Sequence, residues 1–359
     1  MMHRLALASW MALQLAAPLR EAGPVAPQPS VSSARAVNER WVEVLLPEDP
    51  YNPSLVAEAA NYDLTSADDP VYQRAIAPSV VHHRHWPERA RYSASPAGRG
   101  DIASIEVVWR IFLEWPRPLS PGKHYQLTVR KVLGATRGFS FSPDAGPGDA
   151  SKPNEAIHVN QVGYRPQDKK VAYLSCWTGG GSVEFGDGHE FQVIDLDSGK
   201  KVFAGKLRLE IAGKDERWSR SNVYSADFSP LHTVGRFILY VPGTGRSFPF
   251  RIDPDLYNTV AYTLLRGLTL QRDGEHGLTT QITHWARPAA HLDDAIDEQT
   301  GARVDLTGGH MDAGDRGKYP YDSANAAASL LTALEFTPSK WKRSARACRF
   351  RSRITASLI

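Results

Sequence analysis

The spacing of apolar residues changes at Asp253, and this change constrains the fold more than any other feature of the chain. Before it, from Trp41 onward, short segments of alternating apolar and polar residues are separated by turns rich in Gly, Pro, Asp and Ser, as in antiparallel β-sheets. After it, apolar residues recur at helical spacing, at Tyr257, Ala261, Leu264, Leu265 and Leu268. The chain is therefore expected to be multidomain, with β-sheets first and helices second.

A turn-rich stretch divides the β-region into two expected modules. Residues 142–154 contain Pro, Gly, Asp and Ser in quick succession, so we place a boundary there. Residues 41–142 are predicted to form one β-sandwich and residues 155–252 another, each folding independently. Residues 24–40 are rich in Pro, Ser and Ala and are predicted to be a linker.

The polar stretch 81–100 interrupts the first module. It carries a cluster of three histidines, at His82, His83 and His85. Histidine clusters can bind metal, but no carboxylate or cysteine completes a ligand set here. We predict that the cluster lies in a solvated loop, with a metal site as the alternative.

Two helices are predicted after the β-region. Asp253 is a suitable N-cap for the first, because Pro254 then falls at the first helical position. The second is expected to start near Asp322 or Ser323, and its apolar stripe consists of Ala326, Leu330, Leu331 and Leu334. Residues 308–319 therefore lie in the loop just before the second helix.

This loop holds two carboxylates, Asp312 and Asp315, among four glycines at 308, 309, 314 and 317. Glycine permits the backbone angles of a tight turn, and such a turn can direct both carboxylates at one water molecule. A hydrolase needs that arrangement to activate its nucleophile. The alternative is an Asx-rich turn that caps the next helix.

The loop resembles the catalytic-base segment of glycoside hydrolase family 9, the inverting cellulases. Residues 157–166 are similar to the opening strand of the immunoglobulin-like domain that precedes many catalytic modules of this family. Residues 250–253 with 271–274 resemble the junction into the catalytic barrel, and residues 291–294 resemble the next landmark. The four segments occur in family order, so together they are a specific signal.

The resemblance implies a fold. Residues 155–252 would be the immunoglobulin-like domain, and residues 253–341 the start of the catalytic domain. The whole is then a multidomain chain, with two β-sandwich (immunoglobulin-like) modules followed by the first helices of an incomplete (α/α) six-hairpin barrel.

The resemblance also implies roles for four residues. Asp315 matches the catalytic base and Asp312 the aspartate that positions the attacking water. His310 and Tyr319 are expected to bind substrate, although the family more often has Trp at the position of His310. A packed histidine is the alternative for His310.

An inverting glycosidase also needs a general acid, with the two carboxyl groups roughly 6.5–9.5 Å apart. In the family this acid is a Glu far beyond the base. Glu335 is the only Glu after the acidic loop, and it falls within the second predicted helix rather than in an acid motif. No general acid is therefore assigned, and we expect the chain to be truncated and inactive.

The last segment, residues 342–359, is basic and contains no Asp or Glu. It has no helical apolar stripe, so we interpret it as translated out of frame. A basic arm that binds nucleic acid or an anionic surface is the alternative.

The ends of the chain and its composition limit the cellular context. A short basic start, followed by an apolar run from Leu5 to Leu19, predicts a signal peptide over residues 1–23 that is too short to span a bilayer. A secreted protein, extracellular or periplasmic, is expected.

Lys and Arg number 42 against 39 Asp and Glu, which gives no reason to expect nucleic acid or a membrane as partner. Cys176 and Cys348 form no disulfide framework, and Cys176 is predicted to be a buried strand residue.

The function implied by the resemblance is hydrolysis of β-1,4-glucosidic bonds in cellulose or a related β-glucan by an inverting mechanism. The partner is then a β-glucan polysaccharide, and the protein a monomer. No cofactor or metal site is assigned; calcium is common in the family, but no complete ligand set can be read. The alternative is a non-catalytic β-sandwich protein that binds polysaccharide or a partner.

Overall fold

The computed structural model describes residues 32–47, 51–94, 101–132, 136–144, 146–147, 153–215, 217–272, 295–305, 308–312 and 317–336. The chain forms two compact units, Met1–Pro254 and Asp255–Ile359. Several predictions lie outside the described residues: the signal peptide at 1–23, the landmark at 291–294, Asp315 and the basic segment 342–359.

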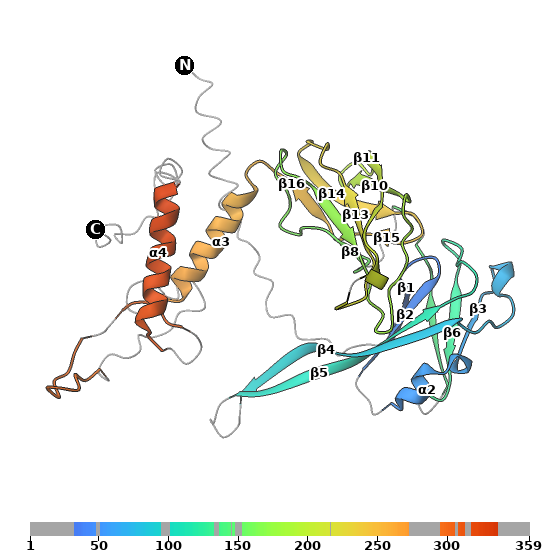
Figure 1. Ribbon diagram of the computed structural model, residues 1–359, viewed down its shortest axis with the longest axis horizontal. Helices are drawn as coiled ribbons and strands as arrows, with labels where there is room; N and C mark the ends of the chain where they lie inside the picture. The colour runs from blue at the N-terminus through green and yellow to red at the C-terminus, as the bar shows by residue number, and fades with distance from the viewer. Residues whose placement is uncertain are drawn as a thin grey trace, which may run out of the picture. The chain divides into compact units, whose positions relative to one another are not determined.

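The first unit begins with a pair of antiparallel sheets (Figure 1). One has the order β1-β2-β5-β4, with bounds Ser33–Ala36, Trp41–Pro47, Asp101–Glu114 and Val80–Ala94. The other has the order β3-β6-β7, with bounds Tyr62–Thr65, Tyr125–Val129 and Arg137–Phe141. A short helix, α2 (Pro53–Ala57), lies between β2 and β3 in the sequence. Both sheets contribute to one buried apolar core, which includes Val44, Leu46, Ile111, Leu127 and Phe141.

A second pair of sheets follows. One has the order β12-β13-β9-β8, with bounds Arg208–Ile211, Val223–Asp227, Val171–Leu174 and Ile157–His158. The other has the order β11-β10-β14-β15, and β16 also pairs with β14; the bounds are Lys201–Lys206, Glu190–Asp195, Gly235–Val241, Gly245–Arg246 and Phe250–Ile252. The predicted hairpin of β10 with β11 is confirmed. These sheets enclose a second core, which includes Leu174, Phe191, Phe228, Phe237 and Leu239.

The two pairs of sheets are packed together rather than separate. Val37, Trp41 and Phe112 belong to the first pair by sequence, but they are buried in the second core. The side chain of Asn154 donates a hydrogen bond of 2.7 Å to the carbonyl oxygen of Val37, and that of Asn38 donates one of 2.8 Å to the carbonyl oxygen of Glu184. The expectation of independent folding therefore does not match the packing within this unit.

Two predictions for the first module are wrong. The linker assigned to 24–40 includes β1, which pairs with β2 from Ser33 opposite Leu45 to Ala36 opposite Val42. The predicted solvated loop at the histidine cluster is instead part of β4, which pairs with β5 along its length. The rings of His83 and His85 lie 5.4 and 4.9 Å from that of Trp109, and the ring of His85 stacks on it.

The second unit contains the helices α3 (Leu256–Leu270) and α4 (Pro320–Phe336). Helix α3 begins three residues after Asp253, so Asp253 is not its N-cap. Helix α4 begins slightly earlier than predicted, because Pro320 suits the first helical position. The described helices include none that is long and apolar enough to cross a membrane.

Candidate active site

The predicted acidic loop is described at residues 308–312 and 317–319, between α3 and α4. It is held to the end of α3 by backbone contacts. The amide of Met311 donates to the carbonyl oxygen of Gln271 at 2.8 Å, and His310 forms a β-bridge with Arg272. Met311 is only 3% exposed, so its side chain anchors the loop. Sequence reasoning did not find this attachment.

The turn before Met311 requires glycine. Gly308 and Gly309 have φ angles of 80° and 81°, in the left-handed region that residues with a side chain rarely adopt. A Cβ on Gly309 would lie 3.7 Å from the hydroxyl oxygen of Ser323, so the turn lies close to the first turn of α4. The loop is thus attached to α3 and lies beside the start of α4.

Asp312 is exposed, as expected of a residue that contacts water or substrate. Its amide donates a 2.9 Å hydrogen bond to the carbonyl oxygen of Gly317. This bond brings together the two ends of the segment 313–316, which contains Asp315. Asp315 itself lies outside the described residues, so the distance between the two carboxylates stays a prediction.

His310 is half-buried beside Arg272. Burial lowers the pKa of its imidazole below the ordinary value, and the positive charge of Arg272 lowers it further. The ring is therefore neutral at neutral pH, when one nitrogen can donate and the other can accept a hydrogen bond. Such a group suits a sugar hydroxyl. The location of His310 in the loop was predicted, whereas Arg272 as its neighbour was not.

Tyr319 presents a half-exposed aromatic ring at the start of α4. Its side chain is 51% exposed, and its carbonyl oxygen accepts a 3.1 Å hydrogen bond from the amide of Asp322. A Cβ on Gly317 would lie 2.7 Å from the Tyr319 ring, so glycine at 317 is needed for the ring to rest there. Its role as a substrate contact stays a prediction.

The described residues supply neither a general acid nor a metal site next to this loop. Glu335 lies in α4, as predicted from the sequence, and its side chain is exposed. In the described parts of the chain, no three His, Cys, Asp or Glu side chains are grouped to hold a metal ion. We therefore assign no calcium-dependent step.

An immunoglobulin-like β-region followed by helices with an acidic loop between them is the layout of a modular glycoside hydrolase. Residues 152–246 match the cellulase N-terminal ig-like domain, and residues 257–355 match glycosyl hydrolase family 9. These two segments are thus similar to the two domains in the order expected, which confirms the resemblance seen in the sequence. The family 9 match includes most of the basic segment 342–359, whose out-of-frame interpretation stays a prediction.

The relatives are glycoside hydrolases. Xyloglucan-specific endo-beta-1,4-glucanase BoGH9A of Bacteroides ovatus is 31% identical over 186 residues, which are 49% of this chain and 29% of that protein. The cellodextrinase of Butyrivibrio fibrisolvens is 32% identical over 182 residues, 50% of this chain and 30% of that protein. A solved metagenome-derived glycoside hydrolase family 9 endoglucanase is 34% identical, with a TM-score of 0.45, and the match covers 51% of this chain and 34% of that one. The chain spans about a third of the length of these relatives.

Proposed function

We propose that the chain is part of an inverting β-1,4-glucanase of family 9, with Asp315 as the catalytic base and Asp312 as the residue that positions the water. The observation that carries this proposal is the attachment of the acidic loop to the end of α3 through the hydrogen bond from Met311 to Gln271. A loop held in this way keeps Asp312 in place when substrate binds. This preorganisation is what catalysis by a positioned water requires.

In the proposed reaction, Asp315 takes a proton from a water molecule as that water attacks the anomeric carbon of the glucan. Asp312 accepts a hydrogen bond from the same water and orients it. A general acid on the opposite side must protonate the departing sugar oxygen. Inversion follows because the water enters on the face of the anomeric carbon opposite to the bond that breaks. His310 and Tyr319 are proposed to bind the sugar beside this water.

We also propose that the polypeptide of these 359 residues is inactive by itself. Glu335 is its only Glu after the acidic loop, and it lies on α4 as an ordinary helix residue. Without an acid, the leaving oxygen departs unprotonated, and general acid–base catalysis contributes roughly 10²–10⁴-fold per group. Helices α3 and α4 are then the first of an incomplete (α/α) barrel. Exposed apolar side chains on them fit this proposal, among them Tyr262, Leu264, Leu331 and Phe336.

The test compares this polypeptide with a chimera in which residues from 337 onward are replaced by the corresponding and following residues of the Butyrivibrio fibrisolvens cellodextrinase. Reducing-sugar release is measured with carboxymethylcellulose, xyloglucan and short cellodextrins. We expect activity only from the chimera, and its preferred substrate then identifies the glucan. Turnover by the 359-residue polypeptide that depends on Asp315 would contradict the proposed inactivity.

Two accompanying proposals concern the β-region and the location of the protein. The first pair of sheets is proposed to be an additional β-sandwich that braces the immunoglobulin-like domain. Residues 1–23 are proposed to direct secretion; the check is the N-terminal sequence of the protein recovered outside the cytoplasm after expression.

The second candidate function is polysaccharide binding without catalysis. It is favoured by exposed indole rings on the β-unit, since Trp218 is 83% and Trp86 46% exposed. Exposed aromatic rings stack on sugar rings. Retarded migration of the 359-residue polypeptide in gels containing soluble β-glucan, lost in Trp218→Ala, would support this function. Unchanged migration would exclude it.

A further inference from the structure

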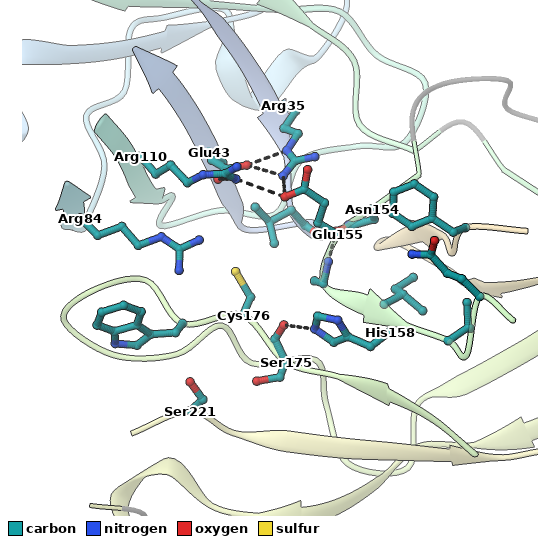
Figure 2. Close-up of a pocket in the computed structure, with 17 residues that line it drawn as sticks. Arg35, Glu43, Arg84, Arg110, Asn154, Glu155, His158, Ser175, Cys176 and Ser221 are labelled. Atoms are coloured by element: carbon teal, nitrogen blue, oxygen red, sulfur yellow. Dashed lines mark hydrogen bonds and ion pairs between the residues drawn. The ribbon is translucent and has the colours of Figure 1, made fainter. Parts of the chain in front are cut away.

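A cavity of about 500 Å³ lies between the two pairs of sheets in the first unit (Figure 2). One wall is the outer face of the β1-β2-β5-β4 sheet, and the other includes the segment 155–159 and the residues that follow β9. Small-molecule sites in proteins have volumes of roughly 300–1,000 Å³. The cavity is therefore large enough for a small ligand. It involves neither the acidic loop nor any proposed catalytic residue.

Four charged side chains, three on the sheet and Glu155 on the facing segment, neutralise one another. Glu43 accepts hydrogen bonds of 2.6 Å from Nε of Arg35 and 2.7 Å from Nη1 of Arg110. The carboxylate of Glu155 lies 3.1 Å from Arg35 and 3.2 Å from Arg110. Figure 2 shows these two guanidinium groups and two carboxylates together at the edge of the cavity. This group adds no net charge to the site.

Arg84 is a fifth charged residue in the cavity, and it stands outside this group of ion pairs. It lies directly opposite Arg110 in the β4–β5 pairing, where like charges repel. Within the described residues it forms no ion pair, and its Nε atom is buried without a hydrogen-bond partner. In Figure 2 its guanidinium group extends into the cavity above Cys176. Burial, followed by the charge of Arg110, lowers the pKa of Arg84, so the surroundings disfavour its positive charge.

Aromatic rings surround this guanidinium group. Its central carbon lies 5.3 Å from the ring centre of Phe112 and 5.5 Å from those of Trp86 and Trp177. These rings stabilise the cation through their faces. They leave the Nε–H group of Arg84 without an acceptor, because ring faces do not replace hydrogen bonds to an oxygen.

The charges and polar groups that line the cavity favour a ligand with one negative charge and several polar groups. The five charged side chains leave one net positive charge, which matches a carboxylate rather than phosphate at about −1.5 to −2. A planar guanidinium fork binds a carboxylate through two parallel hydrogen bonds. The rest of the lining offers the Trp177 ring for stacking and polar groups on Ser221, His158 and Gln161. We propose that this cavity binds an acidic saccharide of the hexuronic acid class, with Arg84 holding its carboxylate.

The test is isothermal titration calorimetry on the 359-residue protein with three ligands. Methyl glucuronoside carries the carboxylate, methyl glucoside is its neutral counterpart, and inorganic phosphate is an oxyanion without a sugar. We expect saturable binding of the glucuronoside, none of the glucoside, and at least ten-fold weaker binding of phosphate. Equal binding of the glucoside, equal binding of phosphate, or no binding of the glucuronoside would overturn the proposal.

The assignment to Arg84 is tested with Arg84→Gln and Arg84→Lys. Both should weaken glucuronoside binding at least ten-fold, since lysine keeps the charge but lacks the planar fork. The matched control is Arg208→Gln, on the exposed strand β12, which should bind like the wild type. Circular dichroism establishes that each variant is folded. Undiminished binding by both Arg84 variants would exclude this residue as the carboxylate ligand.

Cys176 offers a readout in the protein with Arg84 intact. Its thiol lines the cavity, and burial raises its pKa to about 12, so its reaction with a disulfide reagent should be slow. In a Cys348→Ser background, saturating glucuronoside should slow this reaction further, by at least five-fold. Methyl glucoside should have no effect. An unchanged rate at saturating glucuronoside would place the bound ligand elsewhere and overturn the proposal.

Discussion

Nδ1 of His82 lies 2.7 Å from the hydroxyl oxygen of Thr178. This hydrogen bond joins β4 of the first pair of sheets to the loop after β9 in the second pair. The imidazole also packs on Trp41, with ring centres 5.8 Å apart. Gly180 is needed on its other side, since a Cβ there would lie 2.6 Å from the ring. The histidine is thus enclosed at the contact between the two pairs of sheets.

This enclosure predicts that the first unit loses stability in mild acid. Burial lowers the pKa of His82 below its ordinary value of 6.5; Glu114 opposes this shift and His83 adds to it. A histidine whose pKa is lower in the folded state favours folding when neutral, so its contribution is present above about pH 6.5 and is lost as the pH falls below it. The melting temperature should therefore fall between pH 7.5 and 5. His82→Gln should reduce this dependence, whereas His232→Gln, at an exposed site, should leave it unchanged.

Glu43→Gln should destabilise the first unit. The Glu43 side chain is 4% exposed and that of its partner Arg110 is 10% exposed, so the substitution removes a charged partner from a buried guanidinium. Removing one partner of a buried ion pair costs about 3 kcal/mol or more. Urea denaturation measures this loss. Glu190→Gln is the control, because the pair of Glu190 with Lys201 is half-exposed and should contribute little. Equal effects of the two substitutions would refute the importance of the buried network.

Gly317→Ala should displace the Tyr319 ring, because the added Cβ would lie 2.7 Å from it. In the cellodextrinase chimera we expect a higher KM and a smaller change in kcat, since Tyr319 is proposed to bind substrate. Tyr319→Ala should have a similar effect. If Gly317 affects KM only by positioning the Tyr319 ring, the double variant Gly317→Ala/Tyr319→Ala should have the same KM as Tyr319→Ala alone. Additive increases in KM would show that Gly317 has another role.

Asp315→Asn in the same chimera should lower kcat by about 10²–10⁴-fold, the contribution of a general base. Asp312→Asn should lower it less, because it misplaces the water without removing the proton acceptor. Added azide distinguishes the two roles, since it can replace an activated water as nucleophile. It should rescue Asp315→Asn more than Asp312→Asn, and the opposite pattern would exchange their assignments.

Local sequence patterns predicted much of the β-region. The alternation around 191–203 predicted the hairpin of β10 with β11, because a two-sided strand and its turn are specified by neighbouring residues. The strand β1 could not be predicted in this way. Its composition resembles a linker, and its conformation depends on pairing with β2. Likewise, Arg110 and Glu43 are 67 residues apart, and only the completed sheet brings them together.

In the candidate site, too, local features could be predicted from the sequence and long-range contacts could not. The glycines and aspartates identified the loop, because their residue types reflect its local backbone and chemistry. The neighbours of His310 and Met311 could not be read from the sequence, since Gln271 and Arg272 come from the far side of a long connection. For the same reason nothing in the sequence singled out Arg84, whose surroundings come from three separate segments.

Strand β5 contributes to both cores of the β-region, with Ile111 in the first and Phe112 in the second. Neighbouring residues of one strand point to opposite faces, so neither core can melt without disturbing the strand that the other depends on. Calorimetry should accordingly show a single heat-absorption peak for the whole β-region. A mechanical pull on either end would likewise meet the joint resistance of both cores.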